Sequence, residues 1–591
     1  MQLVRLPLLT TLTYALLTAL AFPPFNLATL AFAAPIPLIW LARKLADNDQ
    51  AKPLRAAALV ALASLPLWIF ETHWVARVSS LGFIPLPIYL SLYPALFVYL
   101  AAHTLRAARK QNLRPPAVVW APILWLACEW LRGAVLFHGF PWYFAGHPLI
   151  NIPTLARAAD LIGAAGVSAL TVMTAALITD LAEKRIRTRP IPKLSVATTS
   201  VAVIVLSTWF VSGKTREAPP VERTITVGIV QTNIPQDLRI AWDGRARADA
   251  WDNLEALTRQ AAERTPAPDL IIWPEGIYPG GALDPVPLAV ETELRIYWPF
   301  DQPLPGGARE EIERSESARF ANDLFQLSLD IGVPIIVGGT GMEGPSVETD
   351  DDGRPLYEVA RTYNSMFLLE NGEIRSRYDK LFLTPFGEVM PYFSAIEPLE
   401  QALLALGANG MSFGLDPGAE SLILEPEGLP SLATPICFEA TIARVCRNLV
   451  FTPAGTRRAG IIVNTSNDGW FNHFDAGRAQ HLLAARWRCV ELATPMARSA
   501  NTGTSAIVDA QGRVKNRLPD RQEGVLVAEI SPATGGATLY ARTGDALAWT
   551  CFGLTATLAA GLATAGATRR VVPRKRQARA EPEGQRHGDR A

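Results

Sequence analysis

Eight stretches of the chain are long and apolar enough to cross a lipid bilayer, and this feature limits the possible folds more than any other. A membrane-spanning helix needs roughly 17–25 mostly apolar residues. The stretches cover approximately residues 6–22, 26–42, 56–72, 82–103, 116–135, 158–182, 194–211 and 545–566. The first follows Arg5 and could instead be a signal peptide, a choice that leaves the later topology unchanged. We predict a multi-span α-helical membrane domain with about eight transmembrane helices.

The composition agrees with a membrane protein that carries a soluble part. Hydrophobic residues make up 49% of the chain and charged residues 19%, below the roughly 25% of typical soluble domains. Lys and Arg (55) balance Asp and Glu (55), so no overall charge indicates nucleic acid as a partner. The five cysteines are scattered and include no CxxC pair, which argues against a disulfide framework and against structural zinc.

Basic residues gather in every second loop between the apolar stretches. They are Arg43, Lys44, Lys52 and Arg55; Arg106, Arg109, Lys110 and Arg114; Lys184, Arg185, Arg187, Arg189 and Lys193; and, after the last stretch, Arg569, Arg570, Arg574, Lys575 and Arg576. Loops rich in Lys and Arg remain in the cytoplasm. We therefore expect residues 213–544 on the outer face of the membrane and the C-terminal tail in the cytoplasm.

The part of the chain between the last two apolar stretches reads as an α/β domain, because short apolar runs alternate with helical patterns. The predicted strands are 224–231, 269–274, 333–338, 363–369, 373–378, 431–436, 460–466, 495–500, 504–509 and 523–530, and the predicted helices are about 245–264, 315–331, 439–449 and 477–493. Asn371-Gly372 between two strands predicts a hairpin. The Pro- and Gly-rich stretch 281–312 is expected to be a long loop or an insertion.

These patterns predict five regions along the chain. They are a membrane domain with seven helices at 1–212, a linker at 213–223, the α/β domain at 224–535, the eighth transmembrane helix at 536–567 and a basic, disordered tail at 568–591.

Three titratable residues stand where predicted strands end: Glu275, Lys380 and Cys437. Open α/β sheets place reactive groups just beyond the carboxyl ends of their strands. A cysteine is a nucleophile only as thiolate, so it needs a base, and a partly buried carboxylate can take its proton. A lysine beside them can stabilise an oxyanion. The three would suffice for acyl transfer through a thioester, although each alone is commonly a packing or surface residue and their spacing does not join them.

Longer strings surround these residues. They are Trp273-Pro274-Glu275; Tyr378-Asp379-Lys380 with Pro385-Phe386-Gly387-Glu388; Ile436-Cys437-Phe438-Glu439; and residues 228–234, 363–365, 467–471, 480–482 and 500–503. The strings resemble the nitrilase superfamily and, within it, the apolipoprotein N-acyltransferase family of bacterial lipoprotein maturation. The likeness runs from the first apolar stretches to the eighth, which makes it more specific than a single motif.

The resemblance implies an αββα sandwich in which Glu275 is the general base, Lys380 stabilises the oxyanion and Cys437 is the nucleophile. The supporting residues that it implies are Glu388 near the lysine, Glu439 two positions after the cysteine, Phe438 between them, and Trp242 on a loop at the lipid entrance. Phe438 stands where the family usually has Tyr, which removes a hydroxyl from the site.

The family reaction moves a fatty acyl chain from a phospholipid to the α-amino group of the diacylglyceryl-cysteine of an apolipoprotein. The resemblance therefore implies a phospholipid donor, a diacylated apolipoprotein acceptor, no cofactor and a place in the bacterial cell (inner) membrane. Two alternatives stay open at this point: a membrane-tethered nitrilase-type amidohydrolase, and a non-catalytic lipid-binding membrane protein.

Four other residues have more than one interpretation. Trp142 near the end of the fifth stretch belongs either to an aromatic belt or to the wall of a lipid path. Asn467 begins either a plain turn or a family string, and His481 is expected to be a hydrogen-bonded helix residue rather than a catalyst. Cys446 is not expected to pair with Cys437, because a disulfide would consume the nucleophile.

Overall fold

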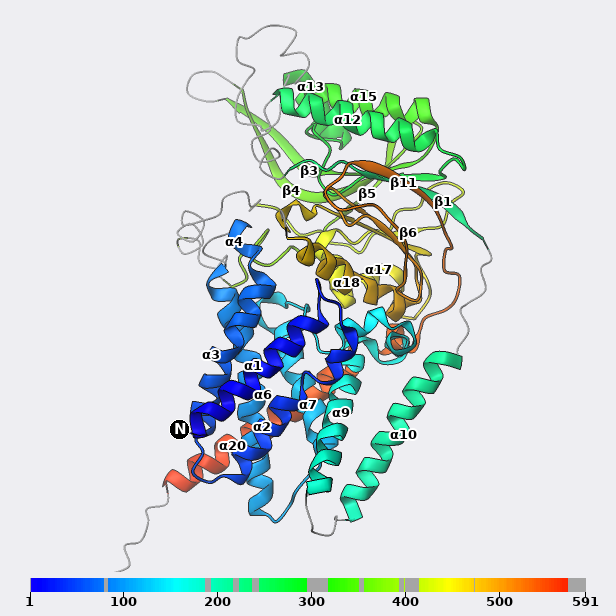
Figure 1. Ribbon diagram of the computed structural model, residues 1–591. Coiled ribbons are helices and arrows are strands. Elements are labelled where there is room, and N and C mark those ends of the chain that lie inside the picture. The colour runs from blue at the N-terminus through cyan, green and yellow to red at the C-terminus, as the bar shows by residue number, and fades with distance from the viewer. Residues whose placement is uncertain are drawn as a thin grey trace, which may run out of the picture.

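The computed structural model describes residues 2–78, 83–186, 193–215, 223–235, 244–294, 317–349, 355–392, 398, 414–471 and 474–571. Figure 1 shows two stacked parts, a bundle of helices that holds the N-terminus and an α/β part above it. The chain leaves the bundle after α10 (Lys193–Thr215) and returns to it through α20 (Ala546–Val571). Most of the predicted linker and most of the predicted tail lie outside the described residues.

The long helices of the bundle overlap the predicted apolar stretches. They are α1 (Gln2–Ala21), α2 (Ile36–Asp47), α3 (Pro53–Thr72), α6 (Pro85–Lys110), α7 (Ala117–Trp130), α9 (Ala159–Ile186), α10 and α20. Two short helices, α4 (Val75–Val78) and α8 (Pro153–Ala156), lie between the predicted stretches. Among the described residues, 7 helical segments are long and apolar enough to span a membrane: Val4–Ala21, Ala28–Asp47, Pro53–Thr72, Pro85–Lys110, Ala117–His138, Ala159–Glu183 and Ala546–Thr564. The stretch at 194–211 lies in α10, whose apolar part Ala197–Ser212 is shorter.

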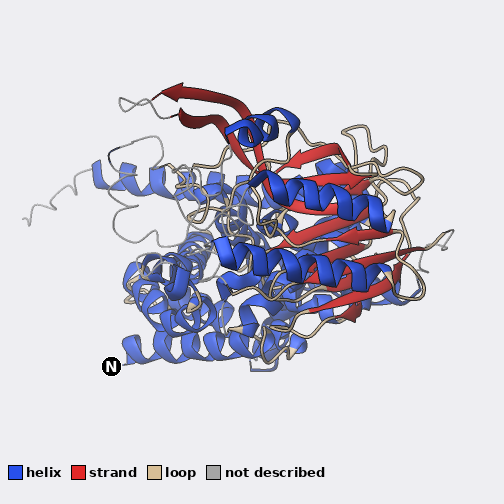
Figure 2. Cartoon of the chain, turned by 90° about the horizontal axis from the view of Figure 1, so that it is seen from above, coloured by secondary structure: helices blue, strands red, loops and turns tan. Residues whose placement is uncertain are grey.

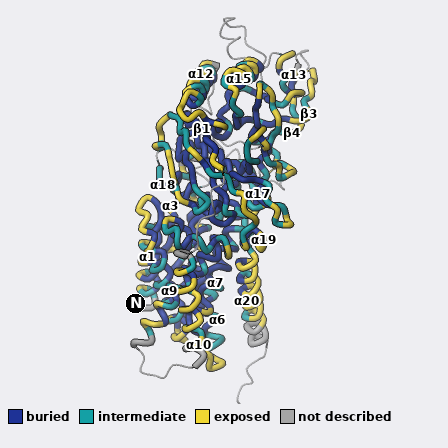
Figure 3. The backbone as a smooth tube through the Cα atoms, turned by 90° about the vertical axis from the view of Figure 1, so that its right-hand side faces the viewer, coloured by how far each residue is buried: buried dark blue, intermediate teal, exposed yellow. Residues whose placement is uncertain are grey.

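The first apolar stretch is part of this bundle, because α1 packs on α2 and α3 and buries Tyr14 and Ala15 in the main core. Figure 3 shows that the outer surfaces of α1 and α20 are exposed. Large apolar side chains such as Leu554 and Leu558 stand on that surface. Apolar side chains on the outside of a helical bundle suit contact with lipid rather than water.

The α/β part contains two sheets that face each other. The strands are β1 (Ile225–Gln231), β2 (Leu270–Ile272), β3 (Ile335–Thr349), β4 (Pro355–Glu370), β5 (Glu373–Asp379), β6 (Leu432–Ala433), β7 (Ile461–Ser466), β8 (Met496–Ala500), β9 (Ala506–Val508), β10 (Val514–Arg517) and β11 (Gly524–Ile530). One sheet has the order β11-β1-β2-β3-β4-β5 and the other β10-β9-β8-β7-β6. Figure 2 shows helices lying across the strands.

Each sheet is covered by helices on its outer face, which gives the predicted αββα order of layers. The helices are α12 (Gly244–Ala262), α13 (Pro285–Leu294) and α15 (Ser317–Ile331) on the six-stranded sheet, and α17 (Ala443–Val450) and α18 (Asp475–Leu492) on the other. One core joins α12 and α15 to the strands through Trp251, Phe320 and Trp273. A second core fills the space between the sheets, where Met366 meets Thr465.

Three predictions about local structure need correction. Within the described part of the stretch 281–312, α13 replaces the expected loop from Pro285, a residue suited to the first turn of a helix, whereas residues 295–312 lie outside the described residues. The predicted helix 439–449 is divided into a 3-10 turn η5 (Cys437–Thr441) and α17, since Ile442 between them is extended. The strands at 333–338 and 363–369 run on into a long hairpin, and β10 was not predicted. The hairpin at Asn371-Gly372 is confirmed, with both residues at positive φ.

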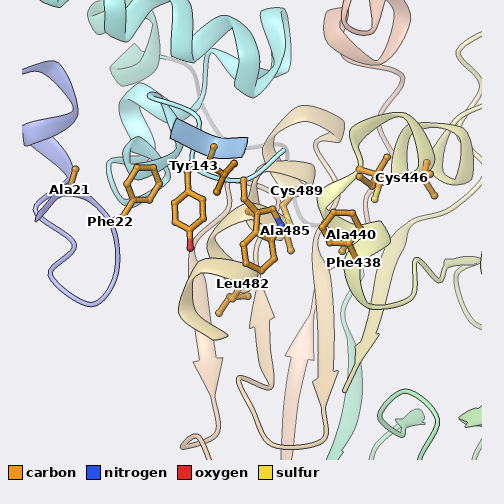
Figure 4. Packing of buried hydrophobic residues seen from close by; sticks show 14 of the residues in the cluster. Ala21, Phe22, Tyr143, Phe438, Ala440, Cys446, Leu482, Ala485 and Cys489 are labelled. Atoms are coloured by element: carbon orange, nitrogen blue, oxygen red, sulfur yellow. The ribbon is translucent and has the colours of Figure 1, made fainter. Parts of the chain in front are cut away.

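The α/β part rests on the bundle through α18. Trp487 Nε1 donates to the carbonyl oxygen of His147 at 3.3 Å, and the amide of Ala164 donates to Glu491 at 2.7 Å. Figure 4 shows Phe22 and Tyr143 of the bundle in one apolar cluster with Leu482 of α18 and with Phe438. The two parts therefore share a buried core, and η5 lies close to the bundle.

Adding a methyl group at Gly338 of β3 is expected to displace the segment that carries Glu275. A Cβ there would lie 2.3 Å from the carbonyl oxygen of Pro274 and 2.9 Å from the Cα of Glu275. Overpacking of this kind costs about 1–3 kcal/mol. We predict that Gly338→Ala lowers the thermal unfolding midpoint in detergent. Gly339→Ala is the matched control, because its Cβ would meet only side-chain atoms at 3.5 Å or more; equal behaviour of the two variants would contradict the prediction.

Candidate active site

The three residues that the sequence singled out meet between the two sheets. Glu275 follows β2 and Lys380 follows β5, both in the six-stranded sheet, whereas Cys437 follows β6 in the other sheet and begins η5. Lys380 Nζ lies 3.5 Å from Glu275 Oε1, and both side chains are buried. Cys437 Sγ lies 3.4 Å from Ser466 Oγ, and the next residue, Asn467, donates its amide N–H to Glu275 Oε2. The charges of Glu275 and Lys380 both affect the pKa of the Cys437 thiol.

A second carboxylate holds Lys380 in its charged form. Glu388 Oε2 lies 2.7 Å from Lys380 Nζ, and its carboxylate also accepts the amide N–H of Thr384 at 2.7 Å. Burial alone would lower the pKa of Lys380, but Glu388 and Glu275 outweigh burial and raise that pKa above its ordinary value. Burial would raise the pKa of Glu388, but Lys380 lowers it. The site therefore contains a fixed ammonium with at least one ionised partner.

Asn364 of β4 joins the two carboxylates. Its Nδ2 donates to Glu275 Oε1 at 2.7 Å and to Glu388 Oε1 at 3.0 Å. The other oxygen of Glu275 accepts the amide N–H of Asn467 at 2.8 Å. Both oxygens of Glu275 thus have donors that fix the orientation of its carboxylate beside Lys380. Asn364 and Asn467 stand in the strings 363–365 and 467–471 that carry the family resemblance, but only the tertiary structure gives them these contacts.

Cys437 stands in an unusual backbone conformation at the turn from strand to helix. Its φ is 51°, in the left-handed region that costs a residue with a side chain roughly 1–2 kcal/mol. It is partly exposed, whereas Cys128, Cys446, Cys489 and Cys551 are buried and unpaired. Burial, and then the charge of Glu275, raise the pKa of the Cys437 thiol, while Lys380 acts in the opposite direction. The thiol is therefore protonated near neutral pH and needs a base.

Glu439 connects the segment that contains Cys437 to the segment that follows Lys380. Its Oε1 accepts the amide N–H groups of Leu381 and Phe382 at 2.7 and 2.8 Å. Its Oε2 accepts the amide N–H of Ile436 at 2.8 Å and the hydroxyl of Tyr378 at 2.9 Å. This fully buried carboxylate links segments of both sheets. Its expected supporting role thus has a geometric basis, the mutual placement of Lys380 and Cys437.

A further polar network lies behind the cysteine, and sequence reasoning found only part of it. Asp468 accepts hydrogen bonds from Arg498 at 2.7 Å and lies 3.0 Å from His481 Nδ1. His481 Nε2 lies 3.3 Å from the carbonyl oxygen of Cys437. His481 is thus a hydrogen-bonded residue of α18, as expected. Arg498 was missed, although an arginine within the apolar run of β8 is the kind of signal that marks a buried ion pair.

The aromatic residues that were singled out have different outcomes. Trp142 is buried against Phe438, Phe471 and His481, at ring distances of 6.3, 6.2 and 5.4 Å, so it does not belong to a lipid-facing belt. Phe438 packs between Trp142 and Phe382. Trp242 lies outside the described residues. Among the described residues, no group of three or more His, Cys, Asp and Glu side chains could hold a metal ion.

Comparisons with known proteins agree with this arrangement of two parts. The family model described as apolipoprotein N-acyltransferase N-terminal domain matches residues 14–177, and the carbon-nitrogen hydrolase model matches residues 226–540. An apolipoprotein N-acyltransferase of Bradyrhizobium diazoefficiens is 30% identical over 571 residues, which cover 91% of this chain and 91% of that protein. One of Geobacter metallireducens is 27% identical, with 92% and 93% covered.

Solved structures match part of the chain. An amidase from Nesterenkonia sp. is 16% identical and has a TM-score of 0.31, with 53% of this chain and 94% of that chain covered. The two relatives cover 92% and 91% of the chain, and the first family model includes most of the helices of the bundle. The chain therefore belongs to the apolipoprotein N-acyltransferase family of the carbon-nitrogen hydrolase superfamily, and it is a multi-pass membrane enzyme of lipoprotein maturation.

Proposed function

We propose that this enzyme carries a fatty acyl chain on Cys437 as a thioester, between a phospholipid donor and the N-terminal diacylglyceryl-cysteine of an apolipoprotein. The observation that carries the proposal is the meeting of a carboxylate and an ammonium at one thiol. Glu275 and Lys380 are 3.5 Å apart, and both charges act on Cys437. In the family reaction these residues are base, oxyanion stabiliser and nucleophile.

In the first step, Cys437 Sγ forms a bond to the ester carbonyl carbon of the phospholipid, and its proton passes to Glu275. The carbonyl oxygen becomes an oxyanion that Lys380 stabilises by its charge. When the C–O ester bond breaks, the leaving oxygen takes the proton from Glu275. Lysophospholipid departs and the acyl chain remains on sulfur.

In the second step, the α-amino group of the acceptor forms a bond to the thioester carbonyl carbon. Glu275 accepts the amine proton, and Lys380 again faces the oxyanion. The C–S bond then breaks, its electron pair returns to Cys437, and the proton held by Glu275 restores the thiol. Amide formation from an ester requires no cofactor, since the donor ester bond supplies the free energy.

The position of the site beside the bundle supports transfer between lipids over amide hydrolysis in water. Trp142 from the bundle side packs against Phe438, next to the cysteine. An apolar wall of this kind limits access of water to a thioester. Basic loops such as the one with Arg106 and Arg109 support the orientation in which the α/β part, residues 224–535, lies on the outer face and the C-terminal tail in the cytoplasm.

The thioester is expected to be directly observable on Cys437. Incubation of the full-length protein with phospholipid vesicles and no acceptor should add the mass of one acyl group, located on Cys437 by peptide mass spectrometry. A diacylated lipopeptide should discharge it. Cys437→Ser should not form the thioester, and Cys446→Ser, which alters a buried cysteine nearby, should form it normally. An acyl group on another residue, or none while transfer proceeds, would sink the proposal.

The two charges beside the thiol should change its reactivity in opposite directions. Glu275 raises the pKa of Cys437 and Lys380 lowers it. Since only the thiolate reacts, Glu275→Gln should shift iodoacetamide alkylation of Cys437 to lower pH, and Lys380→Met should shift it to higher pH. Each change is expected to alter the rate at pH 8 about 10-fold or more. Acyl transfer should be lost in both variants.

Glu343→Gln is the control for this experiment, because that carboxylate pairs with Arg377 elsewhere in the domain. Its alkylation profile should match that of the unmodified protein. If Glu275→Gln slowed alkylation at every pH, the assigned electrostatics of the site would be wrong.

A further inference from the structure

The hydroxyl of Ser466 lies between the nucleophile and a buried carboxylate, and the mechanism above does not use it. Ser466 ends β7 and is fully buried. Its Oγ lies 3.4 Å from Cys437 Sγ and 2.6 Å from Asp468 Oδ1. A hydroxyl has one proton and two acceptor lone pairs, so it donates to only one of these neighbours at a time.

Asp468 receives that proton while the cysteine is a thiol. Asp468 is held as an acceptor, because its other contacts are the guanidinium of Arg498 at 2.7 Å and the ring of His481 at 3.0 Å. Burial would raise the pKa of Asp468, but Arg498 and His481 keep it below its ordinary value. The Ser466 proton then points to Asp468, and the oxygen lone pairs face the thiol.

We propose that Ser466 is a further catalytic residue, whose O–H turns from Asp468 to Cys437 Sγ whenever that sulfur is a thiolate. This inference rests on the proposed role of Cys437 as nucleophile. This change is a rotation of the hydroxyl about the Cβ–Oγ bond. No covalent bond breaks, and the proton stays on Ser466 Oγ. Asp468 keeps Arg498 and His481 as partners during the rotation, which limits the cost of losing the Ser466 hydrogen bond.

The rotation of the Ser466 hydroxyl takes place in both steps of the reaction. In the first step, Glu275 takes the thiol proton and Ser466 donates to the sulfur that keeps the electron pair. The sulfur of the thioester carries no charge, so Ser466 returns to Asp468. In the second step the C–S bond breaks, the electron pair goes to Sγ and Ser466 donates again. Lys380 stabilises the oxyanion, whereas Ser466 stabilises the negative charge on Cys437 Sγ.

The test compares Ser466→Ala with Ser499→Ala in the full-length protein. Ser499 lies on the neighbouring strand β8, is equally buried and donates to the carbonyl oxygen of Val230 at 2.9 Å, away from the cysteine. The measurements are the pH profile of Cys437 alkylation by iodoacetamide, the rate of acyl-adduct formation from vesicles and the rate of its discharge by a diacylated lipopeptide. Loss of a hydrogen bond to a charged group is worth about 10- to 100-fold.

Ser466→Ala should shift alkylation to higher pH and slow both adduct formation and discharge about 10-fold or more, whereas Ser499→Ala should leave all three unchanged. A Ser466→Ala protein with an unshifted alkylation profile would overturn the inference, and an acyl adduct on its Cys437 would show that the proposed function stands. If the unmodified protein forms no adduct on Cys437, the proposed function fails first. Should Ser466→Ala not fold, Ser466→Gly carries the same test, because it also lacks the hydroxyl and adds no atoms.

Discussion

A buried ammonium between two carboxylates is the constraint around which the catalytic part is organised. Lys380 is almost completely removed from solvent, and burying such a charge is costly unless close, well-oriented partners compensate. Glu388 at 2.7 Å and Glu275 at 3.5 Å supply the negative charge, and Asn364 bridges the two carboxylates by donating to both. Glu275 follows β2, Asn364 lies on β4 and Glu388 follows β5, so the site depends on how these strands of the six-stranded sheet are arranged.

The nucleophile follows a strand of the five-stranded sheet, and Glu439 fixes the position of this segment relative to the six-stranded sheet. It accepts amide groups from the turn after Lys380 and from Ile436 just before Cys437. One buried carboxylate therefore sets the relative position of ammonium and thiol, and it also supports the left-handed backbone of the cysteine. His481, which also contacts Asp468, adds a contact to the carbonyl oxygen of Cys437.

The membrane bundle contributes to the site as well as placing it near lipid. Trp142 from the connection after α7 packs beside Phe438 and His481, and α18 holds the bundle through Trp487. The site therefore lies where an apolar surface meets a polar one, which is where an acyl chain and a charged catalytic group can be present together. A separate soluble domain with the same three residues would lack this wall.

The apolar stretches and the ends of the predicted strands could be identified from the sequence, because both depend on residues that are close together in the chain. The apolar stretches indicated the membrane helices, and the positions of Glu275, Lys380 and Cys437 after strands indicated candidate chemistry. The resemblance to a family, rather than spacing, joined those three residues. The tertiary structure alone decided the contacts of Asn364, Ser466 and Arg498, because each acts on a residue of another segment. Side-chain partners separated by many positions are set by how the strands of each sheet order and face one another, and the one-dimensional pattern of a single chain does not contain that ordering.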